Sequence, residues 1–175
     1  LAFVMYERRQ RSPILDLGLF RKNRIFAFSN LAALINYLSI AAVGFILSLF
    51  LQYIDGLTPQ FAGLILLCQP VVQALLSPLA GRLSDRIEPR IISSSGMAVT
   101  AVSLLLFSFL GPNTSGTTIV ANLALLGAGL ALFGSPNTNA IMGSVGRKSL
   151  GVASGTLGTM RQVGQTLGMG ITIMT

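Results

Sequence analysis

The feature that most constrains this chain is the length of its uncharged, apolar stretches. An α-helix rises about 1.5 Å per residue, so about 20 apolar residues are enough to cross the roughly 30 Å hydrocarbon core of a bilayer. The sequence therefore predicts an all-α integral membrane protein whose partner is the lipid bilayer. Its five predicted membrane spans lie at residues 25–51, 61–80, 91–110, 117–136 and 151–175, and the last of them is the weakest.

The composition excludes several other classes of protein. Charged residues make up 10% of the chain, against about 25% in ordinary soluble domains. The chain therefore lacks the polar residues needed to cover the surface of a water-soluble fold. The net charge of +7 does not indicate nucleic acid binding, because the cations occur in short runs between apolar stretches. The chain has no histidine and one cysteine, Cys68. We therefore expect no metal site, no cofactor and no enzymatic function in this segment.

The cations alternate between successive predicted loops. Residues 7–24 contain six Lys and Arg, residues 81–90 three and residues 143–150 two, whereas residues 52–60 and 111–116 contain none. Cytoplasmic loops carry an excess of Lys and Arg. The pattern therefore predicts a multi-pass protein of the cell membrane in which the three basic loops are cytoplasmic.

Both ends of the chain have the composition of interrupted helices. It begins with "LAFVMY", which is too short to span a bilayer, and ends with "GITIMT", which has no polar stop. We expect the chain to be part of a longer protein. On this interpretation residues 1–24 are the end of a preceding helix followed by a basic cytoplasmic connector.

One cation, Arg161, lies inside a predicted span, about ten residues from its start. A central arginine costs about 2.5–3.5 kcal/mol on insertion, and each Leu, Ile, Val or Phe contributes only about −0.3 to −0.6 kcal/mol. The span has six such apolar residues, so we expect it to need neighbouring helices. Intramembrane charges are usually functional. The alternative is that this helix protrudes into the cytoplasm and Arg161 lies at a shallow depth.

Three predicted spans carry a stripe of polar or small residues at helical spacing. The polar candidates on these stripes are Asn30, Tyr37, Gln69, Gln73, Gln162 and Gln165. The last two share their stripe with Gly151, Gly155, Gly158 and Gly168. Small residues allow close helix packing and glutamines can bond between helices, so such stripes indicate either packing faces or a polar transport path. No acidic residue lies in any predicted span, so this segment offers no carboxylate within the membrane that could carry a proton.

The turn "GRLSDRIEPR" concentrates charge between the second and third spans, at Gly81, Arg82, Asp85, Arg86 and Arg90. It resembles the cytoplasmic G-x-x-x-D-[RK] motif of the major facilitator superfamily. Three further stretches resemble that family in the same order. They are "ERRQRSPILDLGLFRKNRIFAFSN", "LSLFLQYIDGLTPQFAGLILLCQP" and "SPNTNAIMGSVGRKSLGVASGTLGTMRQVGQTLGMG". Together they resemble the C-terminal half of the fourteen-helix drug:proton antiporter branch.

The resemblance implies that residues 25–175 form a partial C-terminal half-bundle, with a missing N-terminal half-bundle as its partner. It also implies a multidrug-type exporter that works by alternating access, takes a small-molecule substrate and couples transport to protons. The alternatives are a transport-inactive truncated membrane protein and an uptake symporter of the same fold.

The resemblance assigns the turn motif a role as a latch on the cytoplasmic side. On this hypothesis Gly81 permits a tight helix end, and Asp85 faces the positive N-terminus of a helix beginning near Ile91. Arg86 and Arg90 then pair with acids or helix C-termini that are exposed in only one state.

The cation pattern predicts the outcome of cysteine labelling in intact cells. In a Cys68→Ser background, a cysteine replacing Asn113 should react with an impermeant thiol reagent from outside, because residues 111–116 carry no cation. A cysteine replacing Ser149 should react only after permeabilisation. Labelling of the Ser149 position in intact cells would contradict the orientation.

Overall fold

The computed structural model describes residues 17–112 and 114–174, and all regular structure in these residues is helical. The predictions for residues 1–16 concern residues outside the described part of the chain. The helices are α2 (Leu17–Lys22), α3 (Arg24–Leu49), α4 (Pro59–Leu66), α5 (Cys68–Ser84), α6 (Pro89–Phe107), α7 (Gly116–Gly143) and α8 (Leu150–Met174). A π-helical turn, Phe50–Ile54, extends α3, and a 3₁₀ turn, Arg147–Ser149, precedes α8.

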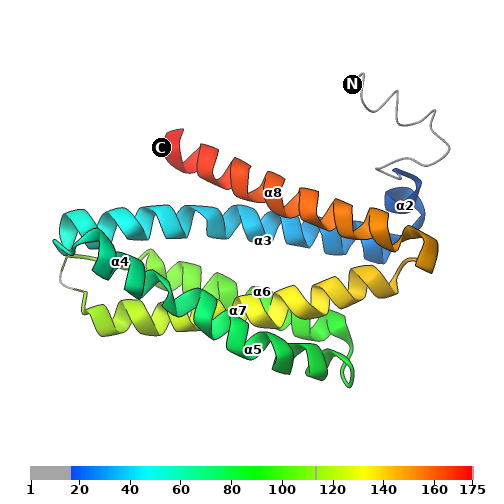
Figure 1. Ribbon diagram of the computed structural model, residues 1–175, viewed down its shortest axis with the longest axis horizontal. Coiled ribbons are helices and arrows are strands. Elements are labelled where there is room, and N and C mark those ends of the chain that lie inside the picture. Colours follow the sequence, from blue (N-terminus) through cyan, green and yellow to red (C-terminus); the bar gives the residue numbers. More distant parts are fainter. Residues whose placement is uncertain (1–16, 113, 175) are drawn as a thin grey trace.

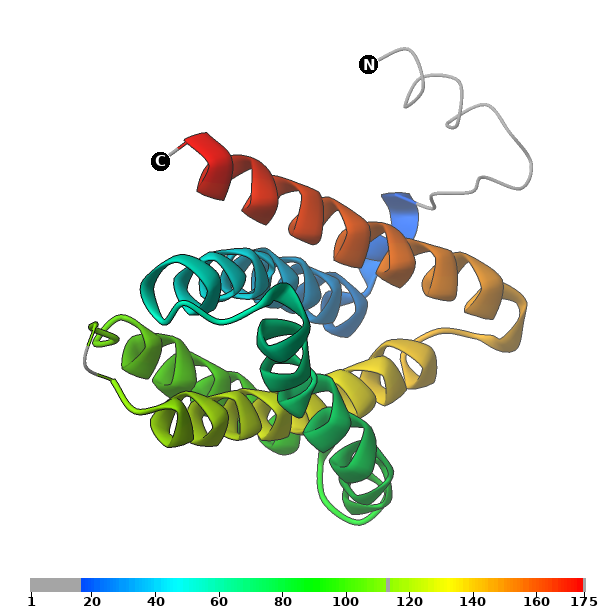
Figure 2. The same ribbon diagram turned by 60° about the vertical axis from the view of Figure 1, so that its left-hand side comes forward.

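The helices form two packed groups, which Figures 1 and 2 show from two directions. In one group α8 lies along α3, and in the other α5 and α6 both pack against α7. Contacts of α7 with α3, and over a shorter length with α8, join the two groups. Half of the most apolar segment of α7 is buried (50%), against at most 22% in the other three apolar helices. α7 is therefore the centre of the bundle.

Four helical stretches are long and apolar enough to cross a membrane, namely Arg24–Ile54, Pro59–Ser84, Pro89–Phe107 and Gly116–Gly143. The fifth long helix, α8, has 25 residues but does not reach the same hydropathy. Arg161 and several glycines account for this, as the sequence indicates. The chain is thus a multi-pass membrane protein in which α8 depends most on its neighbours.

Two proline-containing helices differ from the bounds expected from sequence. The fourth span was expected to end at Pro136, but α7 continues through this buried proline to Gly143. The missing N–H of Pro136 removes one helical bond, and burial of this segment against α3 and α6 offsets that loss. The second span is divided at Leu67 into α4 and α5. Pro70 lies just after the break and cannot donate the bond that would continue α4.

The described basic segments meet at one end of the bundle. Figure 1 shows the start of α3, the α5–α6 turn and the α7–α8 turn together there. Asn23 joins two of these segments: its side chain accepts from Phe26 N (3.1 Å) and donates to Ser144 O (2.6 Å). The common end agrees with the alternating cation pattern, and its cytoplasmic location stays a prediction.

The face of α8 that packs on α3 differs from the predicted stripe. An added Cβ at Gly164 would lie 2.6 Å from Leu34 O, and one at Gly168 would also meet the backbone of α3. By contrast, Gly158 has nothing within 4 Å of that position, and Gln162 and Gln165 are exposed. Only Gly168 of the predicted stripe therefore packs against this bundle. The sequence could not show which of two small-residue faces meets α3.

The close approach of α8 to α3 predicts that Gly164→Ala destabilises the full-length protein. The added methyl group meets backbone rather than a movable side chain, and overpacking of this kind costs about 1–3 kcal/mol. The matched control is Gly63→Ala, because Gly63 is also helical and has nothing within 4 Å. Thermal unfolding in detergent should show a lower Tm for Gly164→Ala alone. Equal Tm values for the two variants would contradict the packing.

Candidate functional site

A polar cavity of about 290 Å³, here called the Arg161 cavity, lies where α3, α5, α7 and α8 meet. Its walls are polar although the surrounding helices are apolar. The lining residues are Tyr37, Gln73, Ser77, Gly134, Ser135, Thr138, Asn139 and Arg161. Because each of the four helices contributes at least one side chain, the cavity exists only when both groups of helices are assembled.

Arg161 is the charged residue of this cavity. It lies 11 positions after Leu150, the first residue of α8, or about 16 Å along the helix axis. Its Nη2 donates to Thr138 Oγ1 at 3.3 Å, and its guanidinium carbon lies 5.3 Å from the centre of the Tyr37 ring. Its Nε is buried and has no hydrogen-bond partner among the described residues. Arg161 therefore points into the bundle, and part of its hydrogen-bonding capacity is unused.

The α5 wall of the cavity is a short series of hydrogen bonds. Gln69 Nε2 donates to Gln73 Oε1 (3.0 Å), and Ser77 Oγ donates to the backbone oxygen of Gln73 (2.6 Å). The spacing of four residues places these side chains on one helix face. Pro78 follows directly, and its ring removes a further backbone donor from α5. Gln69 and Gln73 thus lie on the inner face of a helix with two proline interruptions.

The α7 wall is formed by the residues around Pro136. Thr138 Oγ1 donates to Gly134 O at 2.8 Å while it accepts from Arg161. Asn139 Nδ2 donates to Ser84 Oγ at 2.8 Å, which ties this part of α7 to the end of α5. The sequence "SPNTN" concentrates these polar groups beside a proline. This cluster was the signal for the α7 wall that the helical stripes did not reveal.

The structure brings together some of the predicted candidates and separates others. Tyr37, Gln73 and Arg161 line the cavity, and Gln69 is bonded to Gln73 beside it. Asn30 lies elsewhere: it is buried, its Nδ2 donates to Phe26 O at 2.9 Å, and its Oδ1 has no partner among the described residues. Gln162 and Gln165, as noted above, are exposed on the far side of α8.

The charged turn has a different local structure from the one expected. Gly81 lies inside α5, which continues to Ser84, so it does not form the helix end. Instead, a Cβ at Gly81 would lie 3.0 Å from Ser135 Oγ, so its small size serves the contact with α7. The following helix begins at Pro89 with Glu88 at its N-cap, and no side chain accepts a bond there.

The charges of this turn make few contacts with the described bundle. Arg90 Nε lies 3.7 Å from Glu88 Oε1, and both side chains are exposed. Asp85, Arg82 and Arg86 are exposed and have no hydrogen bond or ion pair between side chains and any described residue. Together with Leu79 and Leu83 they line an open groove at the end of α5. The contact of Asp85 with the next helix is therefore not observed in the described chain.

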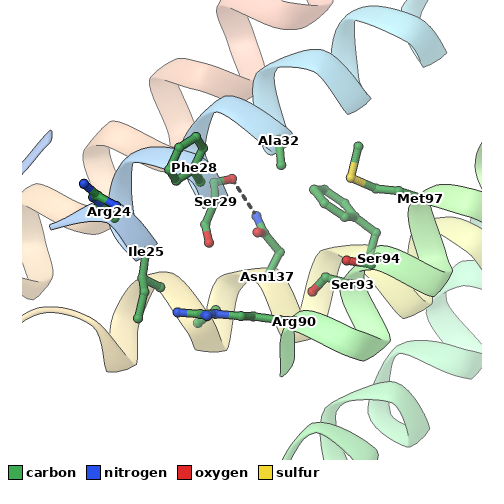
Figure 3. Close-up of a pocket in the computed structure, with 12 residues that line it drawn as sticks. Arg24, Ile25, Phe28, Ser29, Ala32, Arg90, Ser93, Ser94, Met97 and Asn137 are labelled. Carbon is green, nitrogen blue, oxygen red and sulfur yellow. Dashed lines mark hydrogen bonds between the residues drawn. The ribbon is translucent and has the colours of Figure 1, made fainter. Parts of the chain in front are cut away.

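A second cavity, of about 450 Å³, lies between α3, α6 and α7 near the basic end. Figure 3 shows Asn137 reaching toward Ser29, whose backbone oxygen accepts a hydrogen bond from Asn137 Nδ2 at 3.2 Å. Apolar residues such as Phe28 and Met97 form much of the remaining wall. It contains none of the residues of the Arg161 cavity.

Comparisons with known proteins agree on one family. The family model described as Major Facilitator Superfamily matches residues 30–174. The chain is 33% identical over 171 residues to the multidrug resistance protein Stp of Mycobacterium tuberculosis, covering 97% of this chain and 31% of Stp. It is 30% identical over 169 residues to the multidrug efflux pump LfrA of Mycolicibacterium smegmatis, covering 95% of this chain and 33% of LfrA.

The chain is also similar to a relative whose name gives a single substrate. The chain is 29% identical over 168 residues to the riboflavin transporter RibZ of Clostridioides difficile, covering 96% of this chain and 37% of RibZ. The chain therefore spans about a third of the length of these curated relatives.

Proposed function

The chain belongs to the Major Facilitator Superfamily, and on that premise we propose that it is part of a proton-coupled exporter of small molecules. The observation that carries this proposal is the Arg161 cavity, a polar site at the meeting point of four otherwise apolar helices. Transporters of this kind bind their substrates near the middle of the membrane between helices interrupted by proline or glycine. The names of Stp and LfrA favour export of drug-like compounds.

In this proposal the cavity forms one wall of the transport path, and the rest of the protein supplies the other wall. Burial of a polar side chain without partners is costly in lipid, so a cavity rich in polar groups must face water or polar groups at some stage. Alternating access would expose it first to one side of the membrane and then to the other. Protons are the proposed coupling ion, and the acid that carries them would lie outside the described residues.

Transport by the complete protein tests this proposal. Expressed in an efflux-deficient bacterial host, the protein should lower the accumulation of some members of a panel containing ethidium, norfloxacin and fluorescein. A protonophore should abolish the effect. Higher rather than lower accumulation would indicate an uptake symporter, and no change with any compound would indicate a transport-inactive protein.

Arg161→Gln should reduce this transport by about tenfold or more, because a charge-assisted hydrogen bond contributes about 1.5–3 kcal/mol. The matched control is Arg147→Gln, which removes an equal charge from an exposed turn. It should transport as the unaltered protein does. Equal losses in the two variants, at equal amounts in the membrane, would show that only net charge matters.

We propose further that the α5–α6 turn acts as a cytoplasmic latch whose partners lie in the other half of the protein. The support is that Asp85 and Arg86 are exposed and unpaired within the described bundle. Exposed charge pairs contribute only about 0–1 kcal/mol each. Even so, a bias of about 1 kcal/mol changes the ratio of two conformations roughly fivefold.

The latch predicts that Asp85→Asn lowers the transport rate severalfold while folding and membrane insertion stay nearly normal. Asn keeps the shape of Asp85 but loses its charge. The control is Glu88→Gln in the same turn, which loses only an exposed contact with Arg90. Transport rates and equilibrium substrate binding should be measured for both. If neither variant changes transport, the turn is a solvated loop.

A further inference from the structure

The Arg161 cavity has an uncompensated positive charge. Among the described residues, Arg161 is the only charged one that lines it. The acids among the described residues, Asp55, Asp85 and Glu88, all lie in turns at the ends of the bundle. Asp85 is eight residues beyond Ser77 in sequence, which is about 12 Å of helix. No described acid is therefore in a position to neutralise Arg161.

The neutral contacts of Arg161 do not replace a counter-ion. A guanidinium has five N–H donors in a planar fork. In this structure Nη2 bonds to Thr138 at 3.3 Å, the Tyr37 ring lies against the group, and the buried Nε has no described partner. The hydroxyl and the ring lower the free-energy cost of burying the charge, but they leave some N–H donors of the guanidinium without a described acceptor. The ligand that matches such a fork is a carboxylate bound through both oxygens.

The opposite wall supplies donors that suit an anion. Gln73 uses its side-chain oxygen to accept from Gln69, and its amide N–H₂ makes no hydrogen bond with a described residue. Ser135 also lines the cavity, and its hydroxyl makes no hydrogen bond with a described residue. Arg161, Gln73 and Ser135 therefore present unused donors to one space, which contains no described acceptor with a negative charge.

From this arrangement we propose that the Arg161 cavity binds a carboxylate group. The carboxylate belongs either to the transported compound, in which case the inference rests on the proposed transport function, or to a side chain in the part of the protein outside this chain. In both cases its oxygens accept from the guanidinium of Arg161. The cavity thus favours an acidic group.

The sign of the charge in the cavity can be measured without transport. The full-length protein carries Cys68→Ser and Ser77→Cys, because Ser77 lines the cavity, and is purified in lipid nanodiscs. Its reaction rates are compared for an anionic sulfonatoethyl and a cationic trimethylammonioethyl methanethiosulfonate. Protection by benzoate is compared with protection by the neutral analogue benzamide. A cysteine replacing exposed Thr58, just before α4, serves as the reference for the intrinsic reactivity of the two reagents in each variant.

The expected result is faster reaction of the anionic reagent, by about tenfold relative to the cationic one, and protection by benzoate but not by benzamide. Both effects should be lost in Arg161→Gln. Arg161→Lys should keep the preference for the anionic reagent but lose most of the benzoate protection, because an ammonium group lacks the planar fork. This outcome shows that the carboxylate belongs to a soluble compound rather than to the protein.

A second outcome supports the proposal and assigns the carboxylate to the protein itself. The unaltered Arg161 cavity would then show no charge preference, and Arg161→Gln would create a preference for the cationic reagent, because a protein acid would be left unpaired. An unchanged ratio of rates in Arg161→Gln would overturn the proposal, as would an anion preference without benzoate protection. Because neither reagent has to be transported, failure of the transport assays would leave this result intact.

Discussion

An arginine in the middle of a lipid-embedded helix is stable only if other helices give it polar surroundings. This constraint organises the structure around Arg161. Its helix, α8, is not among the four helical stretches that are long and apolar enough to cross a membrane, and its guanidinium points toward Thr138 of α7 and the ring of Tyr37 in α3. Hydrocarbon cannot solvate the charge, so α8 must associate with the bundle to keep the charge out of lipid. The polar cavity follows from that requirement.

The packing that satisfies this constraint depends on small residues. Gly164 and Gly168 let α8 approach the backbone of α3, and Gly96 and Gly129 do the same between α6 and α7. In the second pair an added Cβ at Gly96 would lie 2.5 Å from Phe133 N. Lipid chains are as apolar as leucine side chains, so close backbone packing rather than hydrophobic burial holds such helices together. These glycines therefore place α8 against α3 and α6 against α7, the helices that form two walls of the site.

Four of the five predicted spans coincide with helical stretches long and apolar enough to cross a membrane, because a long charge-free run has few alternatives. The fifth, in α8, stays a prediction. The resemblance to the family was equally readable and is confirmed. The helix ends at prolines were not predictable in the same way. Pro136 lies inside α7 because tertiary packing offsets one missing hydrogen bond, whereas Pro70 follows a break between α4 and α5. A single sequence does not contain the packing energies that distinguish these cases.

The candidate site was partly predictable for a related reason. Arg161 was identifiable because inserting an arginine into a membrane costs free energy. Tyr37, Gln69 and Gln73 were identifiable by their helical spacing. Helical spacing also selected Gln162 and Gln165, which the structure places on the exposed side of α8. The angle between two side chains around one helix follows from their spacing in the sequence. The direction in which that face of the helix points is set by the neighbouring helices. The proposed role of the turn at residues 81–90 as a latch stays a prediction.

The central claim is that otherwise apolar helices line a polar cavity open to water at the level of Arg161. Spin labels at Ser77, which lines the cavity, and at Leu75, which is 69% exposed on the same helix, test it most directly in the full-length protein in lipid. Power-saturation measurements compare collisions with a water-soluble nickel complex and with oxygen, which concentrates in lipid. The account predicts preferential contact with nickel at position 77 and with oxygen at position 75. Preferential contact with oxygen at both positions would contradict it.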